Sequence, residues 1–221
     1  MINHFQIQIK LLSDTTFGRG DGLAGVVDAE VQHDNSGLPY FGGRALRGVL
    51  RDECCQLLHV LNYVSPWVNA AEQLFGVPGS DGASRGLLQI GDAQLLPDLR
   101  AALTRAVQRR DLSRSDVLES LTTIRRQTAI DPKTGVAKRK SLRASRVVLR
   151  ELIFTAEVTP FQALDEQGYE IALLAACVQS LRRLGTGRTR GRGQIICTLR
   201  DDADKDITSK YFEAFATAVQ A

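Results

Sequence analysis

The chain has 221 residues, 43% of them hydrophobic, which is enough to bury a core in one elaborated domain or two small ones. A formal net charge of +3 at pH 7 is only mildly basic, so any binding of nucleic acid must depend on where the charges cluster. Four cysteines without CxxC spacing argue against structural zinc and predict reduced, buried thiols. The lack of a long apolar run argues against export or a membrane contact, which favours a cytoplasmic protein.

The first half of the chain alternates strand-like and helix-like patterns. Apolar and polar residues alternate over residues 5–11, which predicts a strand with one face on a core. Short strands around a turn at residues 35–37 follow, and apolar spacing then predicts a helix over residues 44–63. Residues 76–86 have the composition of a loop, and residues 87–96 predict a further strand.

Polar and basic residues dominate the middle of the chain. The pattern over residues 97–124 predicts two helical pieces, the second capped at its start by Ser113 and Asp116. Residues 125–146 contain turn signals and almost no core-forming residues, which predicts a projecting hairpin or arm. Residues 138–150 carry six basic side chains and no acid, so this region needs an anionic counterpart.

The last part of the chain returns to core-forming patterns. Residues 147–158 predict one continuous strand, residues 172–184 a helix, and residues 194–199 a short buried strand. With the earlier elements, the order is strand, helix, strand, insertion, strand, helix and strand. This order predicts an α+β fold with a ferredoxin-like sheet and insertions.

A glycine-rich loop, LGTGRTRGRGQI, joins the last predicted helix to the last predicted strand. Glycine allows the backbone to approach a partner closely, and arginine offers forked donors that suit phosphate. A solvent-facing connection is one interpretation. A Walker-type loop is disfavoured, because the Lys-Ser/Thr pair is missing and the order is helix then strand. The remaining interpretation is contact with a polyanion, most plausibly a nucleic-acid backbone. The candidate residues are Gly185, Gly187, Arg188, Arg190, Gly191, Arg192 and Gly193.

The start of the helix predicted over residues 44–63 is a second candidate phosphate contact. Gly42 and Gly43 stand just before it, so exposed amides could receive a phosphate there with help from Arg44 and Arg47.

Four separated motifs together resemble one family. They are the GLPY run that leads into residues 43–48, LFG at residues 74–76, AIDPKTGVA at residues 129–137, and the glycine-rich loop. In this order they resemble the RAMP superfamily of CRISPR proteins, specifically the Cas7-like backbone subunits of type III effector complexes. Gly42, Arg44 and Ala45 depart from the family's Pro, Ser and Ser, which removes hydroxyl donors and supplies a guanidinium.

The resemblance implies a single domain over residues 1–221 that binds CRISPR RNA and its target RNA beside other Cas subunits. Its palm, ferredoxin-like and RRM-related, would span residues 1–96 and 147–200, with a helical insertion at 97–124 and a β-hairpin thumb at 125–146. Phosphates would be gripped without regard to base identity, because the target is recognised by RNA pairing. The expected RNA-binding residues are Gly43, Arg44, Arg47, Lys138, Arg139, Lys140, Arg143, Gly185, Gly187, Arg188, Arg190, Gly191 and Arg192.

The resemblance also points to chemistry at Asp28, in the sequence GVVDAEV. Cleaving members of the family have an aspartate in the loop after the first strand, and such a carboxylate can recruit a hydrated Mg²⁺ ion. Asp28 would then be both the catalytic residue and the metal ligand, although an aspartate there could equally bond turn amides. His33 is a weaker candidate, as a general base or as an ordinary surface residue.

Three alternatives stay open at this point. The chain could be a structural RAMP subunit that binds RNA without cutting it. It could be a Cas6-like processing endoribonuclease that works by metal-free acid and base chemistry. It could also be a metabolic enzyme with a phosphate-binding glycine loop.

Overall fold

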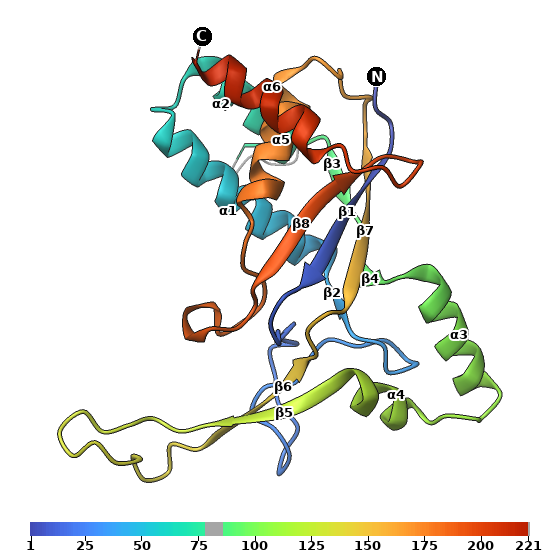
Figure 1. The fold of residues 1–221 in the computed structure, drawn as a ribbon, viewed down its shortest axis with the longest axis vertical. Helices are drawn as coiled ribbons and strands as arrows, with labels where there is room; N and C mark the ends of the chain where they lie inside the picture. The colour runs from blue at the N-terminus through green and yellow to red at the C-terminus, as the bar shows by residue number, and fades with distance from the viewer. Residues whose placement is uncertain (78–85, 221) are drawn as a thin grey trace.

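The structure is a computed structural model that describes residues 1–77 and 86–220. It contains a six-stranded antiparallel sheet, a separate two-stranded hairpin and two groups of helices (Figure 1). The expected mixture of helices with an antiparallel sheet is therefore confirmed. The strands are β1 (Phe5–Leu11), β2 (Tyr40–Phe41), β3 (Leu88–Ile90), β4 (Ala93–Leu95), β5 (Thr122–Gln127), β6 (Arg143–Val148), β7 (Ile153–Pro160) and β8 (Ile195–Arg200). The helices are α1 (Gly43–Val60), α2 (Ser65–Phe75), α3 (Pro97–Gln108), α4 (Arg114–Leu121), α5 (Tyr169–Ser180), the short 3-10 helix η1 (Arg188–Arg190) and α6 (Thr208–Gln220).

Strand β1 lies between β7 and β8 in the sheet, whose order is β2-β4-β7-β1-β8, with β3 also paired to β7. Its alternating residues have their apolar side chains buried, as the sequence predicts. Ile7 lies opposite Ala156 of β7 and Leu199 of β8, and all three are fully buried. One face of the sheet is therefore the floor of the hydrophobic core.

Helices α1, α2, α5 and α6 gather on one side of the molecule, while α3 and α4 lie on the other side (Figure 1). Helix α5 buries every residue from Ile171 to Val178, since it packs against β8, α1, α2 and α6. Trp67 of α2 packs against Tyr169 and Phe215 at ring-centroid distances of 4.9 and 4.7 Å. This cluster joins the helices into one layer above the sheet.

Several local expectations are confirmed. Strand β1 has the predicted bounds, and two helices occupy the segment predicted to hold them. Ser113 accepts a hydrogen bond from the amide of Asp116, whose carboxylate accepts one from the Ser113 amide, which is a complete capping box. The turn at residues 35–37 forms around Gly37, which has a φ of 83°. Of the loop expected at residues 76–86, residues 78–85 lie outside the described residues.

Other expectations are wrong. The strand predicted over residues 147–158 is broken in two. Its first residues belong to β6, which pairs with β5 and ends at Val148, and β7 begins only at Ile153. Between them Glu151 takes a left-handed φ of 69°, and its amide donates to the carbonyl of Leu11. Gly91 likewise divides the strand predicted over residues 87–96 into β3 and β4.

The predicted helix boundaries also shift. Helix α1 ends at Val60 rather than at residue 63, and α5 runs from Tyr169 to Ser180 rather than over residues 172–184. Helices α2 and α6 were not expected. All four cysteines are unpaired, but Cys55 is exposed rather than buried. Among the described residues no helix has both the length and the apolar character needed to cross a membrane.

Candidate nucleic-acid interface

The glycine-rich loop is left-handed at four positions, which favours glycine, and at two of them the neighbouring backbone leaves no room for a side chain. A side chain on Gly193 would place its Cβ 2.1 Å from the carbonyl oxygen of Leu184, and one on Gly185 would come within 2.5 Å of the Thr16 carbonyl oxygen. Such distances cannot be relieved by moving a flexible side chain, because the obstacle is backbone. The left-handed positions are Gly185, Gly187, Gly191 and Gly193, with φ of 81°, 76°, 75° and 74°.

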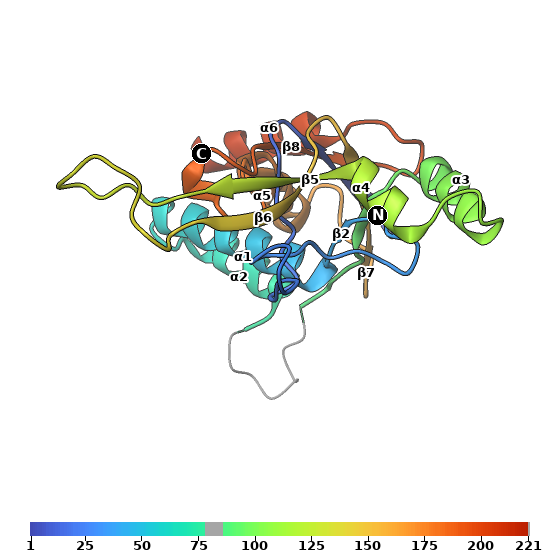
Figure 2. The same cartoon turned by 90° about the horizontal axis from the view of Figure 1, so that it is seen from below.

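Residues 122–148 form an arm that consists of β5, β6 and the segment between them, and it projects beyond the body of the molecule (Figure 2). Its tip is held by polar contacts. The Ser141 hydroxyl donates to the carbonyl of Lys138 at 2.6 Å and accepts from the amide of Ala129 at 3.1 Å. The arm carries four of the basic side chains expected to bind RNA, and all four are exposed. They are Lys138, Arg139, Lys140 and Arg143.

Two pockets that share Gln127 lie along the arm and the glycine-rich loop, and together we call them the basic cleft. The first has a volume of about 290 Å³ and contains four arginines and one aspartate. The second has a volume of about 610 Å³ and contains five basic residues and no acid. The first is lined by Ser13, Asp14, Arg125, Arg126, Gln127, Arg150, Gly191 and Arg192. The second is lined by Gln127, Thr128, Ala129, Lys138, Arg139, Lys140, Ser141, Arg143 and Arg190.

The cations of the first pocket crowd one another. Partial burial lowers the pKa of the Arg192 guanidinium, and the nearby charge of Arg125 lowers it further. Asp14 offsets part of this repulsion, since its Oδ2 accepts a hydrogen bond from Arg125 Nη2 at 2.6 Å. A bound phosphate would relieve the remaining repulsion, because it would add a second anion among these charges.

Both walls of the basic cleft are attached to the segment that follows β1. The amide of Gly193 donates to the carbonyl of Asp14, and the amide of Thr186 donates to the carbonyl of Thr16 at 3.0 Å. On the arm side, Thr15 and Val148 exchange two backbone hydrogen bonds of 3.0 and 2.7 Å. The glycine-rich loop and the arm are therefore held side by side by a few consecutive residues.

The start of α1 is occupied from within the protein. The amide of Gly43 donates to Asp92 Oδ1 at 2.7 Å, so a carboxylate already occupies the predicted phosphate position. Arg44 is exposed, but Arg47 turns inward and its Nη2 donates to the carbonyl of Phe75 at 2.9 Å. Burial lowers the pKa of Arg47. Within the described part of the chain, Gly43, Arg44, Arg47, Gly185, Gly187 and Arg188 do not line the basic cleft.

Asp28 lies at the base of the arm. Its Oδ2 accepts a hydrogen bond from the amide of Ala144 at 2.7 Å, and its Oδ1 lies 4.0 Å from Arg143 Nη1. The carboxylate is 47% exposed, and Oδ1 makes no hydrogen bond to any described residue. Asp28 therefore does bond a backbone amide, and its side chain is still about half exposed.

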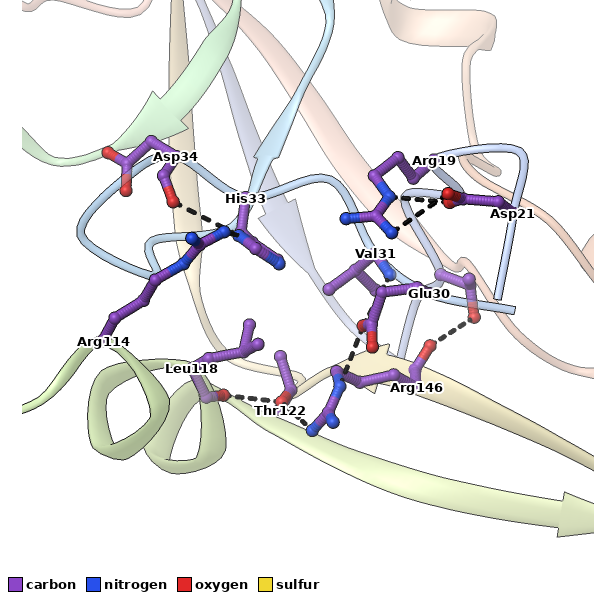
Figure 3. A network of polar contacts seen from close by, with 11 residues as sticks. Arg19, Asp21, Glu30, Val31, His33, Asp34, Arg114, Leu118, Thr122 and Arg146 are labelled. Atoms are coloured by element: carbon purple, nitrogen blue, oxygen red, sulfur yellow. Dashed lines mark hydrogen bonds and ion pairs between the residues drawn. The ribbon is translucent and has the colours of Figure 1, made fainter. Parts of the chain in front are cut away.

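The other catalytic candidate, His33, has different neighbours. Its Nδ1 lies 3.0 Å from Arg114 Nη2 and 3.2 Å from the carbonyl oxygen of Asp34 (Figure 3). The ring therefore packs toward α4, whereas Asp28 contacts β6. The structure does not bring the two residues into one hydrogen-bonded unit.

The fit of Asp28 to a magnesium ion depends on what else can supply oxygen ligands. In residues 1–77 and 86–220 no three His, Cys, Asp or Glu side chains form a group that could hold a metal. Mg²⁺ is commonly held by one or two carboxylates, with water and substrate phosphate as the other ligands. Asp28 fits that pattern only where an RNA phosphate completes the site.

A buried ion pair beneath this loop was missed by the sequence reasoning. Arg146 Nε lies 2.8 Å from Glu30 Oε1, and their side chains are only 10% and 4% exposed. The Nε–H is not directed along the line to the oxygen, so the contact is an ion pair rather than an aligned hydrogen bond. The only sequence signal was the alternation of the acids Asp28 and Glu30 with apolar residues over Val27–Val31.

Comparisons with known proteins agree with the motifs. Two solved structures share the fold: a chain in the cryo-EM structure of the type III-B Cmr-beta bound to cognate target RNA, and a chain in the apo-state cryo-EM structure of the type III-B Cmr-beta. The first has a TM-score of 0.64 and 13% identity over 95% of this chain and 98% of the other. The second has a TM-score of 0.61 and 14% identity over 90% and 98%. The search of curated proteins found no match. The RAMP superfamily model matches residues 8–196, and the chain therefore belongs to the RAMP superfamily.

Proposed function

We propose that the chain is a Cas7-like, RNA-binding subunit of a type III CRISPR effector complex, and that its basic cleft holds the backbone of CRISPR RNA. One observation carries the proposal: the arm and the glycine-rich loop, far apart in sequence, line adjoining pockets that contain nine cations and one carboxylate. A groove of this kind follows a phosphate backbone without reading bases. Membership of the RAMP superfamily supports it.

The strand order supports a ferredoxin-like palm. Around β1 the sheet runs β8, β1, β7, β4, which is the arrangement of a βαββαβ unit with insertions. Within a single domain over residues 1–221, we assign the palm to residues 1–96 and 149–200, the helical insertion to residues 97–121 and the thumb to the arm, residues 122–148. These bounds replace the expected 147–200, 97–124 and 125–146, because β5 begins at Thr122 and β6 ends at Val148.

Binding of single-stranded RNA by the purified full chain tests the proposal. Fluorescence anisotropy over a series of salt concentrations should show an affinity that falls steeply with salt, because counterions are released from phosphates. The double variant Arg190→Gln, Arg192→Gln should bind more weakly, with a salt slope reduced by roughly 1.4 if each arginine contacts one phosphate.

The matched control removes the same charge from the other side of the molecule. Arg105→Gln with Arg109→Gln changes two exposed arginines at the end of α3 and should leave affinity and salt slope unchanged (Figure 1). Equal losses in the two double variants, or binding that ignores salt, would contradict the assignment of the basic cleft. Tight binding of a small phosphate ester without RNA affinity would instead favour a metabolic enzyme.

A second proposed function is metal-dependent cleavage of target RNA at Asp28, which the exposed carboxylate oxygen beside the arm favours. A hydrated Mg²⁺ ion held there would stabilise the charge that develops on the cleaved phosphate. The chain's own part is to fix Asp28 Oδ2 through the Ala144 amide, while Oδ1 faces only the exposed guanidinium of Arg143 at 4.0 Å among the described residues.

Asp28→Asn in the assembled complex separates cleaving from structural subunits, because the amide keeps an acceptor for Ala144 and loses the charge. Target cleavage with Mg²⁺ should fall at least about a hundredfold with RNA binding retained, whereas Asp21→Asn should cleave normally. Unchanged cleavage by the Asp28 variant would leave a non-cleaving RNA-binding subunit. Cutting of CRISPR RNA that resists EDTA and needs His33 would favour a Cas6-like enzyme.

The expected partners are other Cas subunits, CRISPR RNA and its target RNA, in the cytoplasm. Sequencing the RNA that co-purifies with the native assembly tests this directly. Repeat-derived guides are the expected result, and an assembly without nucleic acid would contradict it.

A further inference from the structure

We propose that Arg146 is a positioning residue that couples the arm to the loop carrying Asp28. The inference rests on the proposed role of Asp28 for its functional consequence, but the coupling itself can be measured without RNA. It concerns the network drawn in Figure 3, in which Glu30, His33 and Arg146 line a different pocket from the basic cleft.

The loop and the arm run side by side at this point. The amide of Asp28 donates to the carbonyl of Ala144 at 2.8 Å, and the amide of Ala144 donates back to Asp28 Oδ2 at 2.7 Å. Two residues further along, the amide of Arg146 donates to the carbonyl of Ala29 at 2.9 Å. The carboxylate of Asp28 is therefore held by the arm itself, so any shift of β6 along this loop moves that carboxylate.

The side chain of Arg146 joins three segments. Its Nε pairs with Glu30 of the loop, and its Nη1 donates to the hydroxyl of Thr122, where β5 begins, at 3.3 Å. That hydroxyl in turn donates to the carbonyl of Leu118 in α4 at 2.6 Å (Figure 3). One guanidinium thus fixes the loop, both strands of the arm and, through Thr122, the end of α4.

Arg146 is the outermost buried residue of β6. Along β6 only Arg146, Val147 and Val148 are buried, and the residues from Ala144 outward are partly or fully exposed. Two valines hold the base by apolar packing, but packing alone does not fix an angle. The ion pair supplies direction, since neither buried charge tolerates the loss of its partner.

Buried ion pairs often contribute little net stability compared with apolar pairs of similar size. An effect of Arg146 on the position of the arm can therefore be measured separately from an effect on stability. Replacing both charges, as Glu30→Leu with Arg146→Met, should leave the protein folded while it removes the direction. Arg146→Lys keeps the charge facing Glu30 but cannot also reach Thr122. These variants isolate what the guanidinium fork does.

Amide hydrogen exchange of the isolated full chain is the test. In the double apolar variant and in Arg146→Gln, the amides of Asp28 and Ala144 should exchange at least about tenfold faster, while that of Ile9 in the sheet stays protected. Arg146→Lys should give an intermediate rate. The matched control is Arg19→Gln, which removes an exposed arginine paired with Asp21 on the same loop and should change neither amide.

In the assembled complex, the double apolar variant should lower the maximal rate of target cleavage as far as Asp28→Asn does, with RNA affinity unchanged. Exchange rates at Asp28 and Ala144 that match the wild-type chain in a folded double variant would overturn the proposal. Faster exchange in a protein whose wild-type form cuts no RNA would instead uphold the coupling and refute the role of Asp28.

Discussion

Helix α5 and the arm are held in place by opposite means. Helix α5 buries eight consecutive residues, and its position follows from apolar packing on all sides. The arm buries almost nothing beyond its base, and its tip depends on hydrogen bonds made by Ser141. The buried side chains of α5 cannot contact a partner, whereas the polar arm keeps its basic side chains in solvent. The buried core and the exposed basic arm of this molecule are therefore built from different interactions.

The largest effect is expected in the core. Leu174→Ala removes a fully buried side chain from α5 and should lower the free energy of unfolding by about 2–5 kcal/mol, since a cavity is left. Val136→Ala at the arm tip, where the side chain is 62% exposed, should stay within about 0.5 kcal/mol of the parent. Urea unfolding compares the two. A similar loss in both variants would erase the distinction between core and arm.

The next effect compares two glycines of the glycine-rich loop. Gly191→Ala puts a side chain into open space at a left-handed φ and should cost about 1–2 kcal/mol. Gly193→Ala has the same φ but also drives Cβ into the carbonyl of Leu184, so its cost should be clearly larger. Thermal unfolding measures both, and equal shifts would mean that backbone crowding does not shape the loop.

A smaller effect is expected at the tip of the arm. Ser141→Ala removes the hydroxyl that bridges Thr128, Ala129 and Lys138, which should loosen the tip locally by about 1 kcal/mol. Trypsin should then cut more quickly at Lys138 and Arg139, while the global unfolding midpoint stays the same. A lowered midpoint would show that the tip is coupled to the core after all.

The smallest effect concerns pH. His4 lies between Asp202 and Glu157, at 2.5 and 2.6 Å, and these carboxylates raise its pKa above the ordinary value of 6.5. Because the folded-state pKa is the higher one, this stabilisation is complete below about pH 6.5 and is lost as pH rises through the raised pKa.

His4→Gln should therefore lower the unfolding free energy at about pH 6 by no more than about 1 kcal/mol, because the side chains are partly exposed, and by almost nothing at about pH 9. Urea titrations at the two pH values provide the comparison. A larger loss at the higher pH would reverse the assigned direction of the pKa shift.

Elements defined by local patterns could be predicted from the sequence. The alternation in β1 and the capping residues Ser113 and Asp116 carry their structure within a few positions, and the structure reproduces them. The arm was predictable for the same reason, since its residues lack any face that could be buried. The pairing of its basic side chains with the glycine-rich loop in one cleft remained invisible, because it arises from contacts across the sheet.

Long-range contacts also explain why two residues of the predicted phosphate site have other partners in the structure. Arg47 was expected to face a phosphate, but it bonds the carbonyl of Phe75 at the end of α2, a helix that was not expected. The Gly43 amide is taken by Asp92, which is distant in sequence. The residues next to Arg47 and Gly43 in the sequence do not indicate these partners. The same holds for Glu30 and Arg146, which are separated by the whole of the insertion.

The short segment from Asp14 to Thr16 sets a consequence for any strand that enters the basic cleft. Because consecutive residues bond the glycine-rich loop on one side and the arm on the other, the walls cannot separate without breaking backbone hydrogen bonds to this segment on at least one side. The width of the basic cleft at this point is therefore set when the chain folds. An RNA that binds there as proposed would have to bend its own backbone to follow the cleft.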